Sequence, residues 1–386
     1  MAYEQQRQRL LMKYPAIEDL AKKACQRMPQ VGWEYLITGT GREELVHRNT
    51  ADFNEITLTP QFCKGQLNPR IQTTLFGQQY QAPYGVAPVG LTGLMWPRAE
   101  VLLAQTAVKR GIPFTLSTLA TETPETVGPH VGEMGWFQLY PPREPELRRT
   151  LLKRAWDHGF RTLMVTADVP TPSRRERTKR AGMGIPPKIS ANFLWQGLTH
   201  PVWSWGTLKN GLPSLRTVAN YSEFSSMMSV GEFVQDQMGG NLSWEYCQQV
   251  RDEWDGPVVV KGLLHPRDAE IAVEIGMDGV VVSNHGARQF DGAPSAIKAL
   301  PEVVRAVKGK TKILMDSGVR SGLDILRALS LGADFVFLGR AFIYGVAALG
   351  KIGGEHVVEI LSGDLKNNMS QLGIEDLNEL YDGLAS

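Results

Sequence analysis

Two valine-rich stretches decide the fold: Val258-Val259-Val260-Lys261-Gly262 and, one helix-length segment later, Gly279-Val280-Val281-Val282-Ser283-Asn284-His285-Gly286. In both, three consecutive valines lead directly into polar or small residues. The valines do not alternate with polar side chains, which is typical of strands that are buried on both faces. Two such strands with a helix-length connection between them predict a parallel β-α-β unit.

The same unit repeats along the chain. Further apolar runs occur at 84–90, 114–118, 136–140, 162–168, 312–318 and 335–340. The connecting segments, such as 97–111 and 321–332, have apolar residues at helical spacing and end in glycine, a common helix stop. Eight β-α units in one chain predict a closed parallel barrel, the (β/α)8 or TIM barrel of the α/β class.

Two segments fall outside this repeat. Residues 1–55 contain no clear strand and predict a helical N-terminal leader. Residues 169–257 predict a lid insertion after the fourth strand, on the face where barrel enzymes carry their active sites. Three lid tryptophans, Trp195, Trp203 and Trp205, either pack the lid onto the barrel or form a patch for a membrane surface. We expect 1–386 to be a single domain that includes leader and lid.

Composition favours a cytoplasmic globular enzyme. The chain has 386 residues with 42% hydrophobic and 21% charged residues, and its net charge of +1 gives no electrostatic reason for a nucleic-acid partner. Cys25, Cys63 and Cys247 form no C-x-x-C pair, so we expect reduced thiols and no metal site. The first residues lack the features of a signal peptide, and no apolar run approaches the ~20 residues that span a bilayer.

Polar residues that could react collect at the carboxyl ends of the predicted strands. They are Gln138, Tyr140, Thr166, Asp168, Lys261, Ser283, Asn284, His285, Asp316, Gly339 and Arg340. Because barrel enzymes assemble their active sites at this rim, we expect these side chains to surround one site.

His285 suits proton abstraction near neutral pH, since it is the only histidine at a predicted strand end. Asp168, on a neighbouring strand, could orient its ring and stabilise the imidazolium. Arg288 follows His285 closely, and Arg175 follows Asp168. Two guanidinium groups can hold one carboxylate through bidentate bonds, which indicates an acidic substrate.

A cofactor with one phosphate fits the last two strands. Asp316-Ser317-Gly318-Val319-Arg320 and Gly339-Arg340 lie where barrels commonly bind phosphate. A nicotinamide cofactor would call for G-x-G-x-x-G, and Gly39-Thr40-Gly41 lacks the third glycine. Lys261 could form a Schiff base with pyridoxal phosphate or stabilise an anionic reduced flavin. The two arginines beside a histidine favour hydride removal from a hydroxy acid.

At this point the sequence resembles the family of FMN-dependent L-2-hydroxy-acid dehydrogenases and oxidases. The segment Ser283-Asn284-His285-Gly286-Ala287-Arg288-Gln289 resembles the family signature, and the resemblance covers nearly the whole chain. The segments 136–140, 260–262, 316–320 and 338–340 recur in order. The lid, at 169–172 and 199–205, looks most like bacterial membrane-associated L-lactate dehydrogenases and then mandelate dehydrogenase.

This resemblance implies a role for each matching residue. It makes His285 the base, Asp168 its partner and Tyr140 a stabiliser of the substrate hydroxyl or oxyanion. Arg175, Arg288 and Tyr35 would bind the substrate carboxylate. Lys261 would lie at flavin N1 and O2, where negative charge grows on reduction. The remaining FMN contacts that it implies are Pro88, Val89, Gly90, Ser117, Gln138, Thr166, Ser283, Asp316, Gly318, Arg320, Gly339 and Arg340.

Gly90 and Leu119 narrow the choice within the family. Oxygen-using oxidases of the family typically carry alanine at the position of Gly90, and glycolate oxidase has a bulky tryptophan at the position of Leu119. We therefore expect a dehydrogenase for lactate or a similar acid, with a quinone or another respiratory acceptor. An oxidase or monooxygenase that uses oxygen, an FMN-dependent isomerase, and a binding module without activity are the alternatives. The resemblance also implies a homotetramer or larger assembly, peripheral on the inner face of the cell membrane.

Overall fold

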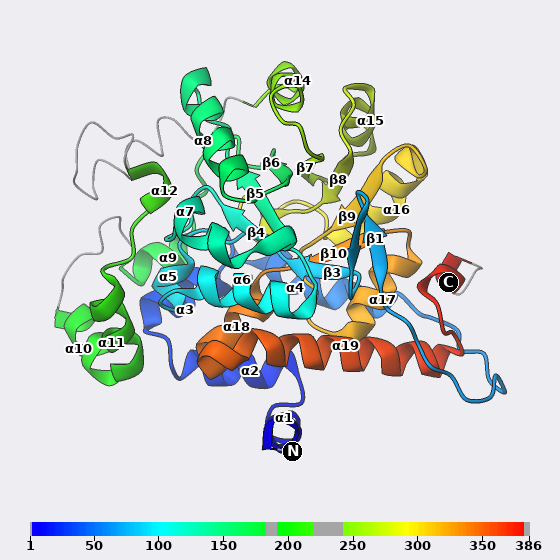
Figure 1. Ribbon diagram of the computed structural model, residues 1–386, viewed down its shortest axis with the longest axis horizontal. Coiled ribbons are helices and arrows are strands. Elements are labelled where there is room, and N and C mark those ends of the chain that lie inside the picture. Colours follow the sequence, from blue (N-terminus) through cyan, green and yellow to red (C-terminus); the bar gives the residue numbers. More distant parts are fainter. Residues whose placement is uncertain (1, 183–190, 220–241, 382–386) are drawn as a thin grey trace.

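The computed structural model describes residues 2–182, 191–219 and 242–381. Eight parallel strands close into a barrel in the order β10-β3-β4-β5-β6-β7-β8-β9, as Figure 1 shows. The strands are β3 (Tyr84–Val86), β4 (Phe114–Ser117), β5 (Gly135–Leu139), β6 (Thr162–Thr166), β7 (Val258–Leu263), β8 (Gly279–Val282), β9 (Lys312–Met315) and β10 (Phe335–Leu338). Each lies within or overlaps one of the eight predicted apolar runs, so the predicted (β/α)8 barrel is confirmed.

Large apolar side chains fill the interior of the barrel. They are Trp136, Met164, Val259, Val281, Leu314, Phe335 and Phe337. A short hairpin, β1 (Thr73–Leu75) with β2 (Gln78–Tyr80), packs Leu75 and Tyr80 into the same cluster. The Trp136 indole donates a hydrogen bond of 3.1 Å to the Tyr80 hydroxyl. Strands of three residues give too short a pattern to recognise, and the sequence did not predict this hairpin.

Helices surround the strands and bury apolar faces against them. In α16 (Ala296–Val307), the apolar positions are Ile297, Leu300, Val303 and Val307, which recur at the three- and four-residue spacing of one helix face. The other outer helices are α6 (Ala99–Arg110), α7 (Pro124–Val127), α8 (Pro145–Asp157), α14 (Trp244–Asp252), α15 (Pro266–Glu274), α17 (Gly322–Ser330), α18 (Arg340–Leu349) and α19 (Gly353–Leu372). Among them, α14 belongs to the segment that the sequence assigned to the lid. It lies between β6 and β7 in the chain, and it buries Tyr246, Cys247 and Val250.

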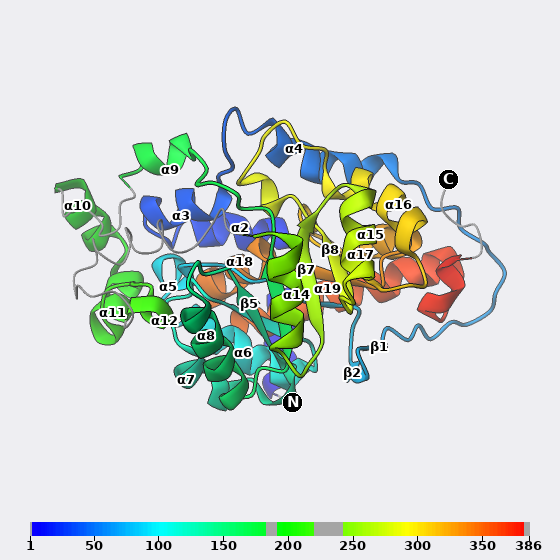
Figure 2. The ribbon, with the colours of Figure 1, turned by 90° about the horizontal axis from the view of Figure 1, so that it is seen from above.

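The leader is helical, as predicted. It consists of α1 (Ala2–Lys13), α2 (Ile17–Cys25), α3 (Gln30–Ile37), α4 (Glu44–Ala51) and the 3-10 helix η1 (Asp52–Glu55). Ile17, Leu20 and Ala24 of α2 are buried, and α2 packs against α18. Figure 2 shows α3 beside the lid, while α4 lies farther along and packs against the turn that begins at His285. The leader therefore reaches the rim of the barrel as well as its outer layer.

The described part of the lid contains α9 (Glu176–Arg180), α10 (Ala191–Thr199), α11 (Pro201–Asn210) and α12 (Arg216–Ala219). Its tryptophans differ in exposure, and the structure assigns only one of them to packing. Trp203 is buried and donates a hydrogen bond of 3.0 Å to the Leu94 carbonyl. Trp195 and Trp205 are 64% and 69% exposed. Within the described residues, the helices are too short or too polar to span a bilayer.

Candidate active site

A cavity of about 570 Å³ opens at the carboxyl ends of the strands. Most of the predicted site residues line it: Tyr35, Pro88, Val89, Gly90, Leu119, Gln138, Tyr140, Thr166, Arg175, Lys261, His285, Arg288, Asp316, Gly318, Arg320, Gly339 and Arg340. The other three lie one layer behind. Ser117 donates to Gln138 (2.6 Å), Asp168 binds His285 (2.8 Å), and Ser283 accepts from Lys261 (2.9 Å). The structure thus brings all of the predicted residues together.

His285 is held at both ring nitrogens. Its Nδ1 lies 2.8 Å from Asp168 Oδ1, and its Nε2 lies 3.2 Å from the Tyr140 hydroxyl. An ionised Asp168 can only accept, so Nδ1 carries the proton and Nε2 is an unprotonated acceptor. The Tyr140 hydroxyl then donates to Nε2. Because Nε2 belongs to a ring that lines the cavity, it can take a proton from a molecule bound there.

The backbone at His285 is strained. The φ angles of His285, Gly286 and Ala287 are 58°, 61° and 66°, in the left-handed region that residues with a Cβ rarely adopt. Hydrogen bonds hold the turn: the amides of these residues donate to Ser283 Oγ, Ser317 Oγ and Asn284 Oδ1, each at 3.1 Å. Strain that the surroundings enforce in this way is common at functional sites.

Burial and neighbouring charges set the protonation states of His285, Asp168 and Tyr140. It lowers the pKa of His285 below its ordinary value, and Asp168 only partly offsets this effect. Burial alone would raise the pKa of Asp168, but the charges of His285 and Lys261 outweigh it and lower the pKa. Burial, with the charge of Asp168, raises the pKa of Tyr140 far above neutrality. At neutral pH the site therefore holds a neutral imidazole, a carboxylate and a phenol that still carries its proton.

Two guanidinium groups face the cavity near His285. Arg288 Nη1 donates to the carbonyls of Tyr35 (2.6 Å) and Thr38 (3.0 Å), and its guanidinium lies 4.8 Å from the centre of the Tyr35 ring. Arg175 contacts Ser173 Oγ at 2.8 Å and Gln289 Oε1 at 3.4 Å. Burial and the charge of Arg175 lower the pKa of Arg288 to about 9. Neither arginine contacts a carboxylate through these bonds, so an anionic ligand would relieve the repulsion between the two guanidinium groups.

Lys261 extends from β7 beneath the cavity and is buried. Its Nζ lies 3.1 Å from Asp316 Oδ2 and 2.9 Å from Ser283 Oγ. Burial alone would lower the pKa of Lys261, but Asp316 and Asp168 outweigh it and raise the pKa. A lysine that stays protonated is not a Schiff-base nucleophile at neutral pH, whereas it favours negative charge on a bound group.

The polar wall beside Lys261 fits a flavin ring. Gln138 Nε2 donates to Thr166 Oγ1 (2.8 Å) and Gln138 Oε1 accepts from Ser117 Oγ. These bonds fix the amide orientation of Gln138, which comes from β5, beside Thr166 from β6. A fixed row of hydroxyl and amide groups next to a lysine offers donors and acceptors to the nitrogen and oxygen atoms of isoalloxazine.

The part of the cavity that Arg320, Gly339 and Arg340 line suits an anion. Gly339 is the N-cap of α18, and the first amides of that helix have no partner within it. Arg320 lines the same region, and burial together with the charge of Arg320 lowers the pKa of Arg340 to about 10. The Arg340 side chain donates to the carbonyls of Leu36, Thr38 and Gly286 (2.8–3.1 Å). Its backbone amide, with Gly339 and Arg320, would therefore hold the phosphate.

A glycine brings the leader close to this anion-binding end. The φ of Gly318 is 100°, and a Cβ there would lie 1.8 Å from the Asn49 carbonyl oxygen. No other residue allows this approach of the β9 loop to α4.

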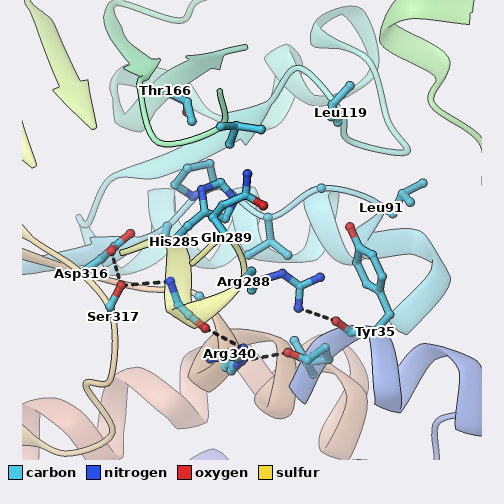
Figure 3. Close-up of a pocket in the computed structure, with 18 of the residues that line it drawn as sticks. Tyr35, Leu91, Leu119, Thr166, His285, Arg288, Gln289, Asp316, Ser317 and Arg340 are labelled. Carbon is cyan, nitrogen blue, oxygen red and sulfur yellow. Dashed lines mark hydrogen bonds between the residues drawn. The ribbon is translucent and has the colours of Figure 1, made fainter. Parts of the chain in front are cut away.

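The other end of the cavity is apolar. Figure 3 shows Leu91, Leu119 and Tyr35 on the side away from Asp316 and Ser317. A Cβ at Gly90 would lie 3.4 Å from Leu119 Cβ and 3.7 Å from the Tyr35 hydroxyl. Met95 and Leu215 also line the cavity and are buried. The side chain of a bound molecule thus meets mainly apolar groups beside Gly90 and Leu119.

Sequence reasoning assigned no specific contact to several residues that shape the site. The Ser317 hydroxyl donates to Asp316 Oδ1 and accepts from Gly286 N. Asn284 and Asn49 exchange two side-chain hydrogen bonds of 2.8 and 2.6 Å, which join the β8 loop to the leader. Ser317 and Asn284 lie inside the sequence segments that resemble the family, so their place near the site could be predicted. Nothing in the sequence pairs Asn49 with residues more than 200 positions away.

The fold and the site together define a (β/α)8 barrel enzyme whose cavity suits a phosphate-bearing cofactor and contains a neutral histidine. The family model of the FMN-dependent dehydrogenases matches residues 24–386, and the chain belongs to this family. The predicted family and the predicted FMN are thereby confirmed. The wall formed by Gln138, Thr166 and Lys261 and the anion-binding end at Gly339 are where the chain would hold FMN.

Curated relatives and solved structures agree with this assignment. The chain is 39% identical to L-lactate dehydrogenase of Pectobacterium atrosepticum over 369 residues, which cover 95% of both chains. It is 39% identical to L-lactate dehydrogenase of Xanthomonas euvesicatoria pv. vesicatoria, covering 95% of this chain and 94% of the relative. The crystal structure of the monotopic membrane protein (S)-mandelate dehydrogenase matches with a TM-score of 0.91 at 34% identity, covering 96% of this chain and 98% of that one.

Proposed function

We propose that this enzyme oxidises an L-2-hydroxy acid, lactate or a similar acid, to the 2-oxo acid with His285 as base. One observation carries the proposal: a histidine whose Nε2 is unprotonated, fixed by Asp168, shares a cavity with two arginines that no carboxylate of the described chain neutralises. The relatives named as L-lactate and (S)-mandelate dehydrogenases support the same substrate class.

The residues divide the work as follows. Arg175 and Arg288 bind the substrate carboxylate, which orients the hydroxyl-bearing carbon toward His285. Tyr140 donates a hydrogen bond to the substrate oxygen, because its hydroxyl keeps its proton. His285 Nε2 takes the proton that the acid releases, and Asp168 stabilises the imidazolium. FMN would supply the acceptor for the hydride, which carries the two electrons and the second hydrogen, and Lys261 would favour the negative charge that develops there.

Anaerobic mixing with a panel of acids tests this proposal. L-lactate and (S)-mandelate should bleach the flavin absorbance of the holoenzyme, whereas D-lactate at the same concentration should not. Absence of bleaching by every 2-hydroxy acid would contradict the proposal and support the isomerase alternative. A purified protein without flavin colour would support the binding-module alternative.

Leu119 is the residue that we propose limits the size of the substrate side chain. It lies against Gly90 at the apolar end of the cavity. Leu119→Trp should shrink this end and lower kcat/KM for lactate relative to glycolate, which lacks the methyl group, by roughly 10-fold or more. An unchanged ratio of the two kcat/KM values would remove Leu119 from the specificity site.

For the electron acceptor we propose a membrane quinone, with oxygen as the alternative. The support is Gly90, where the resemblance places alanine in oxidases, and the exposed tryptophans of the lid. Alanine at 90 would place its Cβ 3.2 Å from the Leu119 carbonyl oxygen, a tight contact that small shifts can relieve. Reduced enzyme should reoxidise with a soluble quinone at least 100-fold faster than with dissolved oxygen in a stopped-flow experiment. Rapid reoxidation by oxygen alone would establish the oxidase.

The outer face of the lid is the proposed contact with the inner surface of the cell membrane. Trp195, Leu198, Val202, Trp205 and Leu208 are each 59% to 77% exposed on α10 and α11. Apolar side chains of this size contribute roughly 1.5–3 kcal/mol each when buried, and indole rings favour the interface. The solved relative described as a monotopic membrane protein supports this placement.

Flotation with lipid vesicles tests the membrane contact. The enzyme should float with vesicles that contain anionic lipid, and the double variant Trp195→Gln/Trp205→Gln should lose at least tenfold in partitioning. The control variant Phe62→Ser/Val108→Ser removes two exposed apolar side chains elsewhere on the molecule and should float like the wild type. Equal flotation of both variants would show that the lid face is not the contact.

A further inference from the structure

One arginine of the lid forms ion pairs with two carboxylates of the leader. Arg177 Nη2 and Nε lie 2.7 and 2.9 Å from Glu34 Oε2, and Nη1 lies 2.7 Å from Glu43 Oε2. Arg177 belongs to α9, and Figure 2 shows α9 beside α3 of the leader. All three guanidinium nitrogens of Arg177 therefore bind the leader, which lies more than 130 residues away in the chain.

Further hydrogen bonds reinforce this connection. The hydroxyls of Thr38 and Thr178 lie 2.8 Å apart and are buried. The amide of Gly41 donates to Glu176 Oε2 at 3.1 Å. Glu43 is itself fixed, because its Oε1 accepts from the amide of Gly39. The contact between α9 and residues 34–43 thus has a defined geometry, beyond the attraction between opposite charges.

The same leader stretch also holds a cation of the active site. The Thr38 carbonyl accepts from Arg288 (3.0 Å) and Arg340 (3.1 Å), while its hydroxyl contacts the lid. Tyr35 accepts from Arg288 through its carbonyl. Residues 34–43 therefore lie between the β8 loop and the lid and contact both.

Arg175 lies on the lid side of this contact. It precedes α9 directly, with a left-handed φ of 41°, and its side chain donates to Ser173 and Gln289, which both lie on loops. A helix of five residues has little stability of its own in water, so α9 takes its position from the groups that it contacts. Whatever fixes α9 against the leader also fixes the base of the Arg175 side chain.

We propose that Arg177, Glu34 and Glu43 form a latch that positions Arg175 over the substrate carboxylate. The inference rests on the proposed function, in which Arg175 binds that carboxylate. Arg177 is a positioning residue: it contacts the leader and acts on the substrate only through Arg175. Opening the latch weakens substrate binding and leaves the chemical step at His285 intact. Its ion pairs are partly exposed, at 41% for Arg177, so salt screens them.

Steady-state and anaerobic stopped-flow kinetics of the holoenzyme with L-lactate test the latch. Arg177→Gln should raise KM and the apparent Kd roughly three- to tenfold, with the limiting rate of flavin reduction changed less than twofold. Glu43→Gln should have the same effect in smaller degree, and adding it to Arg177→Gln should change little, because the pair is already broken. Arg180→Gln, an exposed residue of the same charge on the same helix, is the control and should match the wild type.

Proteinase K digestion provides a readout that does not depend on the reaction. Cleavage within the lid should be faster in Arg177→Gln than in Arg180→Gln. Unchanged KM and unchanged digestion in Arg177→Gln would overturn the latch. A variant that loses FMN and limiting rate to the same degree as its KM rises would also overturn it, because that pattern indicates a folding defect. A wild type that no hydroxy acid reduces would refute the proposed function, while faster digestion of Arg177→Gln would still show the lid contact.

Discussion

At the residue scale, the state of His285 follows from a competition between two effects. Burial disfavours the imidazolium, and the carboxylate of Asp168 favours it; burial is the larger effect, so the pKa is lowered. The free enzyme therefore has a neutral imidazole at this position. In the proposed reaction, the short bond to Asp168 stabilises the imidazolium that forms when His285 takes a proton.

The base assignment predicts the behaviour of His285→Gln. The amide cannot accept a proton at neutral pH, yet it retains polarity and similar size. Because a general base contributes roughly 10²–10⁴-fold, flavin reduction by L-lactate should slow by at least about 100-fold. The absorption spectrum should still show a full complement of FMN, since the phosphate and ring contacts are elsewhere. Near-normal turnover would refute the assignment.

The pH dependence of kcat/KM gives a second prediction at this scale. Only neutral His285 can take the proton, so activity is lost as pH falls through its pKa in the free enzyme. Because that pKa is lowered, the acid limb should lie below pH 6.5, with a tenfold loss per pH unit beneath it. Asp168→Asn removes the group that raises this pKa, so it should shift the limb to lower pH while lowering kcat. An acid limb above pH 7 in the wild type would contradict this account.

Sequence reasoning placed the candidate site residues together because a barrel brings every strand end to one rim. It found His285, Lys261 and Asp316 in this way without any knowledge of their distances. It gave no role to Thr38, whose carbonyl accepts from Arg288 and Arg340. A backbone carbonyl has no sequence signature, and the contact depends on how the leader folds back over the rim.

At the element scale, the end of β7 meets the residue that orients the base. The φ of Gly262 is 109°, and a Cβ there would lie 2.5 Å from both Cβ and Cγ of Asp168. The β7–β8 register also shifts between Lys261 and Leu263. Glycine at this bulge therefore lets the β6 loop bring Asp168 over the strand end.

Gly262→Ala and Gly276→Ala separate backbone strain from this contact. Gly276 has a φ of 77°, and a Cβ at this position would meet no atom within 4 Å, so alanine there should cost only about 1–2 kcal/mol. Gly262→Ala adds a steric overlap with Asp168 and should cost more in chemical denaturation. It should also lower kcat severalfold or more, whereas Gly276→Ala should leave kcat unchanged. Equal kcat values for the two variants would show that Asp168 tolerates the displacement.

At the scale of the whole molecule, the barrel was predictable and the way the leader closes over it was not. Buried parallel strands leave a clear record, because runs such as Val258–Leu263 lack alternation. Leader residues such as Asn49 and Thr38 are polar, and their partners in the β8 loop lie more than 200 positions away. Such long-range polar contacts follow no period in the sequence. The lid was recognised from its length, but the division of its tryptophans between core and surface required the structure.

The crowding of cations around one cavity has a consequence for the stability of the whole molecule. Arg175, Arg288, Arg320 and Arg340 line the cavity, and mutual repulsion contributes to the lowered pKa values of Arg288 and Arg340. In the FMN-free protein this repulsion opposes folding, and the phosphate of FMN would offset part of it. FMN at 100 times its Kd should therefore stabilise the fold by about 2.7 kcal/mol and raise Tm by about 3–5 °C.

Riboflavin separates the contribution of the phosphate from that of the ring, because it has the same ring and ribityl chain without the anion. In thermal denaturation of FMN-free protein, riboflavin at the same concentration as FMN should raise Tm by much less. Arg320→Gln should reduce the difference between the two ligands, since Arg320 lies at the anion-binding end beside Gly339. Arg305→Gln, which removes an exposed arginine on α16, should leave that difference unchanged. Equal shifts by FMN and riboflavin would mean that ring contacts alone stabilise the protein and that the cations at Gly339 do not bind the phosphate.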